Sequence, residues 1–171
     1  MNKLLSLLLL TTLTGCGAIN PTRKATSLQP ADWNEATCIE YRFVDSSVPP
    51  EYHRSYDVAF TDSTITLSID SYGIVLFSRQ YTNTPSAFRA FKDELASQDI
   101  KQYDDEATSA CDGGTSETLR LFKGADKYFD AYVYHCDGES GTLHMPDGAT
   151  RLILSQLPES IDSLVSSTMQ D

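Results

Sequence analysis

Three histidines are the residues of this chain that could activate a serine or cysteine nucleophile: His53, His135 and His144. A serine nucleophile of a hydrolase often lies in a Gly-x-Ser-x-Gly turn, and the sequence contains no such motif. Its nearest approach is Ser140-Gly141, close to His144, in a stretch that is equally typical of a connecting loop. We therefore expect no nucleophilic site, although a pair of carboxylates from distant positions would leave no motif.

A metal site would require His135, Cys136, His144 and nearby acids to converge. Adjacent residues of a strand point to opposite faces, so His135 and Cys136 cannot both face one ion. The Asp-Gly pairs resemble fragments of calcium loops, but the spacing of oxygen ligands does not follow them. These pairs begin at Asp112, Asp137 and Asp147. We expect turns at these positions, and no metal or other cofactor.

The segment 128–134 is the most informative run of aromatic residues. Alternation along a strand places Phe129, Ala131 and Val133 on one face, where they suit a core. The opposite face then carries a row of tyrosines, with Asp130 among them. The row consists of Tyr128, Tyr132 and Tyr134. Such a row either stabilises the sheet through cross-strand contacts or forms a recognition surface for a protein, peptide or glycan.

The elements that position these residues are strands followed by helices, twice along the chain. The runs 38–44, 56–60, 64–70 and 74–81 predict strands of an antiparallel meander, with clear alternation in the third. Thr84-Pro85 predicts a helix start, and Phe88, Phe91 and Leu95 recur at helical spacing. The helix should end near Gln98.

The second half predicts a hairpin of 117–122 and 127–135, in which Phe122 faces Lys127. An amphipathic segment follows Pro146, and Pro158 divides it into two short helices. The sequence therefore predicts an α+β fold, an antiparallel sheet with helices packed on one face. The order is compatible with a repeated hairpin-helix unit.

The cysteines Cys38, Cys111 and Cys136 allow three disulfide pairings. The expected hairpin register brings residues 111 and 136 within two positions of facing each other. We therefore predict a bridge between Cys111 and Cys136 at the open end of the hairpin, and a buried, unreactive Cys38.

The charge balance excludes one class of partner. The chain has 13 basic and 24 acidic residues, a formal net charge of −11. Such a surface repels phosphate backbones, so we expect no binding of nucleic acid.

The first sixteen residues have the organisation of an export signal: Lys3, the apolar run 4–10, and Leu13-Thr14-Gly15-Cys16. This pattern resembles the lipobox of bacterial lipoprotein precursors. The resemblance implies that residues 1–15 are a signal peptide and that Cys16 is the mature N-terminus, carrying acyl chains such as palmitate. Gly17 instead of Asp then favours the outer membrane, facing the periplasm, in a host with two membranes.

Beyond Cys16, residues 16–31 are polar and lack periodicity, so we expect a flexible tether and a single domain of residues 32–171. These observations predict a lipid-anchored envelope lipoprotein that binds a partner without catalysis. Two alternatives stay open: a periplasmic hydrolase of an envelope substrate, and a structural or stress-response lipoprotein without a specific ligand.

Mass spectrometry of the mature protein tests the anchor. We expect a chain that begins at Cys16 and carries acyl groups on that residue. An unmodified mature start, or a full-length precursor in the cytosol, would contradict this prediction.

Overall fold

The computed structural model describes residues 24–104, 113–136 and 138–169. Four helices and ten strands lie in this part of the chain. In chain order they are β1 (Ala25–Ser27), α1 (Pro30–Glu35), β2 (Cys38–Val44), β3 (Ser55–Thr61), β4 (Thr64–Ser71), β5 (Ile74–Thr82), α2 (Pro85–Ala96), β6 (Lys101–Tyr103), β7 (Thr115–Lys123), β8 (Asp126–Cys136), β9 (Gly138–Gly141), β10 (Leu143–His144), α3 (Asp147–Ser155) and α4 (Ile161–Ser167).

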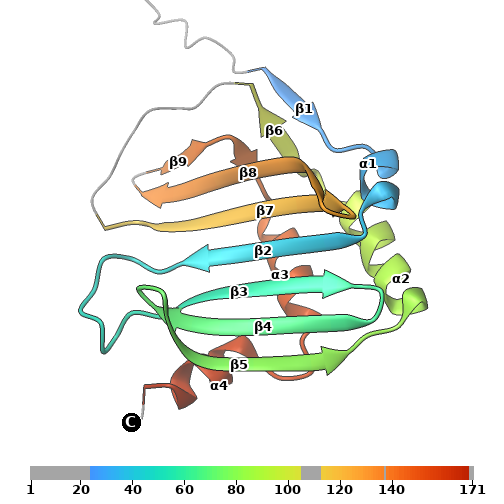
Figure 1. The fold of residues 1–171 in the computed structure, drawn as a ribbon. Coiled ribbons are helices and arrows are strands. Elements are labelled where there is room, and N and C mark those ends of the chain that lie inside the picture. Colours follow the sequence, from blue (N-terminus) through green and yellow to red (C-terminus); the bar gives the residue numbers. More distant parts are fainter. Residues whose placement is uncertain (1–23, 105–112, 137, 170–171) are drawn as a thin grey trace, which may run out of the picture.

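Seven strands form one antiparallel sheet in the order β5-β4-β3-β2-β7-β8-β9 (Figure 1). Strands β2 and β7, which are the first strands of this sheet in the two halves of the chain, pair with each other near its centre. Strands followed by a helix do occur twice, as expected. Helix α2 follows a four-stranded meander, β2 to β5, whereas α3 follows β7, β8 and β9 of the large sheet and β10 of the small one, so neither half is a single hairpin followed by a helix.

The helices lie on one side of this sheet, which confirms the predicted α+β class (Figure 1). Their buried residues join the inward side chains of the strands in a single apolar core. Helix α2 contributes Phe88, Phe91 and Leu95, the three residues that its spacing predicted. Helix α1 contacts the Tyr128 end of β8, and no other described helix lies on the opposite face of the sheet, so much of that face is accessible to solvent (Figure 1).

Local signals in the sequence set several boundaries. The hydroxyl of Thr84 accepts a hydrogen bond from the backbone N–H of Ala87, and Pro85 occupies the first turn of α2. Pro158 lies between α3 and α4, so the two tandem helices are confirmed. Phe122 faces Lys127, as predicted, but the register shifts between Leu121 and Phe122. Because of this irregularity, every pair farther from the turn is displaced by one residue from the predicted register.

The segment expected to be a tether is partly folded. Strand β1 pairs with β6, which also pairs with β10, so three distant segments form a small second sheet. Helix α1 follows and buries Trp33 in the core. The ordered domain therefore begins by Ala25, earlier than the predicted residue 32. Among the described residues, no helix has the length and apolar composition needed to cross a membrane.

Two leucines test how strongly the inner face of the sheet stabilises the fold. Leu67 on β4 is 0% exposed and Leu76 on β5 is 42% exposed. Leu67→Ala should lower the free energy of unfolding by about 2–5 kcal/mol, because it leaves a cavity in the core. Leu76→Ala should change it by less than about 0.5 kcal/mol. Urea unfolding followed by the fluorescence of the single tryptophan, Trp33, measures both, and equal losses would contradict the described packing.

Candidate functional site

The tyrosine row of β8 lies on the open face of the sheet. Tyr128 and Tyr134 are 40% and 47% exposed, and Tyr132 is half-buried. The residues between them on the strand, Phe129, Ala131 and Val133, are buried beneath the sheet. The predicted alternation is therefore correct, and Asp130 is exposed on the tyrosine side.

The structure separates Tyr128 from the other two tyrosines. The rings of Tyr132 and Tyr134 meet edge to face, with centroids 5.3 Å apart and planes at 73°. The Tyr128 hydroxyl instead donates a hydrogen bond to the carbonyl of Asp32 on α1, at 2.5 Å. Burial and the nearby acids Asp32 and Glu35 raise the pKa of Tyr128 to about 12. We therefore assign Tyr128 to the contact with α1 and retain Tyr132 and Tyr134 as site residues.

A groove of about 400 Å³ runs beside these two tyrosines, over strand β7. Cross-strand pairing from β2 through β7 to β8 explains its shape, because short hydroxyl side chains on β7 lie between longer ones. The three rows are Val44, Ser116 and Tyr134; Arg42, Thr118 and Tyr132; and Glu40, Arg120 and Asp130. All of these residues except Glu40 line the depression, which we call the β7 groove.

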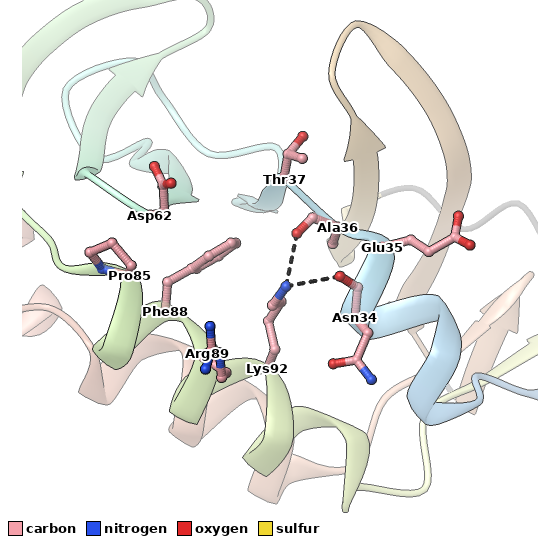
Figure 2. Close-up of a pocket in the computed structure, with 9 residues that line it drawn as sticks. All are labelled: Asn34, Glu35, Ala36, Thr37, Asp62, Pro85, Phe88, Arg89 and Lys92. Carbon is pink, nitrogen blue, oxygen red and sulfur yellow. Dashed lines mark hydrogen bonds between the residues drawn. The ribbon is translucent and has the colours of Figure 1, made fainter.

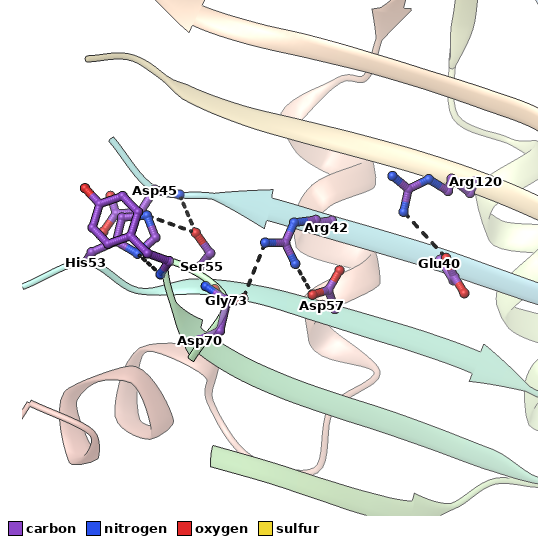
Figure 3. A network of polar contacts seen from close by, with 10 residues as sticks. Glu40, Arg42, Asp45, His53, Ser55, Asp57, Asp70, Gly73 and Arg120 are labelled. Carbon is purple, nitrogen blue, oxygen red and sulfur yellow. Dashed lines mark hydrogen bonds and ion pairs between the residues drawn. The ribbon is translucent and has the colours of Figure 1, made fainter. Parts of the chain in front are cut away.

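One wall of the β7 groove is an ion-pair network on β2, β3 and β4 (Figure 3). The guanidinium of Arg42 binds Asp57 and reaches Asp70 at 3.4 Å. Burial raises the pKa of Asp57, and the charge of Asp70 adds to this effect while Arg42 opposes it. Arg42 is therefore held in place by two carboxylates.

The end of the groove is closed by a second group of charges. Arg120 lies 3.7 Å from Glu40 and 3.2 Å from Asp130, which also binds Lys127. Partial burial of Asp130 would raise its pKa, but the hydrogen bond from Lys127 and the charge of Arg120 outweigh it and lower the pKa. Each charged side chain that lines the groove thus faces an opposite charge.

His53 is buried in a structural contact beside this network (Figure 3). Its ring stacks on Tyr72 at 3.8 Å, and its Nδ1 accepts the backbone N–H of Tyr72. Its Nε2 lies 3.3 Å from Ser55 Oγ, which accepts the N–H of Asp45. Since Nδ1 is an acceptor, the neutral ring carries its proton on Nε2 and donates to Ser55. This arrangement cannot remove a proton from the serine hydroxyl.

His135 belongs to a second polar cluster, on the helix side of the sheet. Its Nε2 lies 2.9 Å from Glu117, whose other carboxylate oxygen accepts the hydroxyls of Tyr41 and Thr150 at 2.9 Å each. Burial, above all, and the neighbouring Tyr56 and Glu117 raise the pKa of Tyr41. The cluster joins β2, β7 and β8 to α3, which is a structural role. His144 lies on β10.

Besides the β7 groove, other depressions lie on the described surface, and two of them lie between helices. One, of about 310 Å³, lies between α1 and α2, where Lys92 Nζ donates to the carbonyls of Asn34 and Ala36 at 3.1 Å each (Figure 2). Desolvation lowers the pKa of Lys92, and the charge of Arg89 acts in the same direction. This lysine satisfies carbonyls at the end of α1. The other depression lies between α3 and α4, and no histidine lines any of the three.

No group of three or more metal-binding side chains occurs in the part of the chain that the structure describes. Cys38 is a free thiol and is half-buried, where we expected it to be buried. Cys111 and Asp112 lie outside the described residues, as does Asp137. The bridge between Cys111 and Cys136 therefore stays a prediction.

Sequence reasoning found the tyrosines but missed the rest of the β7 groove. Arg42, Thr118 and Tyr132 become neighbours only because β2 pairs with β7, and no local signal predicts that pairing. Comparison with known proteins found no match to a family model, a curated protein or a solved structure.

The environment of Cys38 predicts that its thiol reacts slowly with alkylating reagents. Burial, with a smaller contribution from Glu40, raises its pKa from 9.0 to about 11. Only the thiolate reacts, and a higher pKa makes that thiolate scarcer but more nucleophilic, so alkylation at pH 8 should be about 10-fold slower in the folded protein than in urea. Peptide mass spectrometry after timed iodoacetamide treatment measures both rates. Equal rates in the two conditions would contradict the prediction.

Proposed function

We propose that this chain is a lipid-anchored cell-envelope protein whose domain binds a partner through the β7 groove, without catalysis. The observation that carries the proposal is the arrangement of Tyr132 and Tyr134 over a floor of hydroxyl side chains, on a face that the helices leave open. Aromatic side chains beside a few placed polar groups are typical of recognition sites.

The positions of the histidines favour binding over hydrolysis. Hydrolysis by a serine nucleophile requires a base that accepts the serine proton near an accessible pocket. His53 is buried and its Nδ1 already accepts a hydrogen bond, while His135 faces Glu117 behind the sheet. Neither residue lines the β7 groove.

The proposed anchor is consistent with the short distance along the chain from Cys16 to the first described residue. Eight peptide units separate Cys16 from Lys24, the first described residue. A fully extended segment of that length spans roughly 28 Å. Acyl chains on Cys16 would therefore hold the domain close to the bilayer, within reach of other components of the envelope.

The test compares envelope material retained by the full-length protein in detergent micelles. The double substitution Tyr132→Ala with Tyr134→Ala should reduce retention at least tenfold, because it removes one wall of the groove. Tyr52→Ala is the matched control, since Tyr52 is 61% exposed and lies outside the groove. Thermal unfolding monitored by circular dichroism confirms that each variant folds.

A folded double variant with undiminished retention would contradict the proposal. So would a wild-type protein that retains no envelope material, and this second result would favour a structural lipoprotein without a specific ligand.

A further inference from the structure

We propose that the ligand of the β7 groove is an uncharged saccharide chain. This inference rests on the proposed function and specifies the chemistry of the same site. It depends on three properties of the groove: its backbone, its charges and its walls.

The backbone around the groove is already paired. Strand β2 pairs with β3 and β7, and β8 pairs with β7 and β9. An extended peptide usually binds a sheet by adding a strand to an open edge, where main-chain groups provide the affinity. The β7 groove crosses the middle of the sheet and has no such edge. Recognition there must use side chains, which disfavours a peptide.

The charges of the groove are also matched. Arg42 faces Asp57 and Asp70, and Arg120 faces Glu40 and Asp130. An anionic ligand would have to replace one of these carboxylates, and a cationic ligand one of the arginines. A neutral ligand can bind without breaking an ion pair. A guanidinium has five N–H donors, so Arg42 can hold its carboxylates and still donate to a ligand hydroxyl.

The walls and floor suit a sugar ring. Ser116 and Thr118 supply hydroxyls along β7, and Tyr132 and Tyr134 present aromatic surface at an angle to each other. A pyranose has apolar C–H faces and hydroxyls around its rim, so it can contact the rings and the polar groups at the same time. From Ser116 to Arg120 the floor extends about 13 Å, a length that fits a short oligosaccharide.

The experiment identifies the chemistry of the retained material. Envelope fractions are treated either with periodate, which cleaves vicinal diols of sugars, or with a broad protease. They are then quenched and offered to the full-length protein in detergent micelles. We expect periodate to reduce retention at least tenfold and protease to change it less than twofold.

Salt provides a second measurement. Retention of a neutral saccharide should change less than twofold between 0.05 and 0.5 M NaCl, because screening weakens only interactions between charges. Wild type, Tyr52→Ala, and Tyr132→Ala with Tyr134→Ala are measured under each condition.

The outcomes separate the two proposals. Retention that requires both tyrosines but is lost after protease, or falls steeply with salt, overturns the saccharide and leaves the binding function intact. Retention that is independent of the tyrosines overturns both. Loss with periodate, resistance to protease and insensitivity to salt, all dependent on the tyrosines, support the saccharide.

Discussion

The two faces of the seven-stranded sheet have opposite physical requirements, and the rest of the structure depends on this difference. Along β2, β7 and β8, one set of alternating residues packs under the helices and the other set remains in water. A shift of one residue in any of these strands would exchange the two sets. The apolar requirement of the inner face therefore fixes which side chains meet on the outer face, including the walls of the β7 groove.

Much of the fold could be predicted because its signals are local. The cap at Thr84, the helical spacing of Phe88 and Phe91, and the break at Pro158 each act within a few residues. The alternation of residues along β8 also predicted correctly that the tyrosines lie on the face opposite to Phe129, Ala131 and Val133. Helix α1 and strand β1 were missed, because elements of six and three residues are too short to show a period.

The site was harder to predict because it is assembled across strands. Its ion pairs join residues up to 80 positions apart, such as Glu40 and Arg120. The depth of the groove comes from Ser116 and Thr118 being shorter than their neighbours on β2 and β8. That contrast becomes visible only when the strand order is known, and the pairing of β2 with β7 leaves no motif in the sequence. The irregularity at Leu121 likewise has no marker such as glycine.

The small sheet of β1, β6 and β10 ties the N-terminal segment to the rest of the domain. The chain enters the domain through β1, which binds β6 by backbone pairing, and β6 in turn binds β10. If the N-terminus is fixed to a bilayer, a pull on the domain would load this small sheet before the larger one. The two sheets meet at Thr142, whose carbonyl accepts the N–H of Tyr103 on β6 and whose N–H donates to the carbonyl of Tyr132 on β8, at 2.8 Å each. A pull that passed from β1 to β6 would therefore reach the strand that carries the tyrosine wall of the groove.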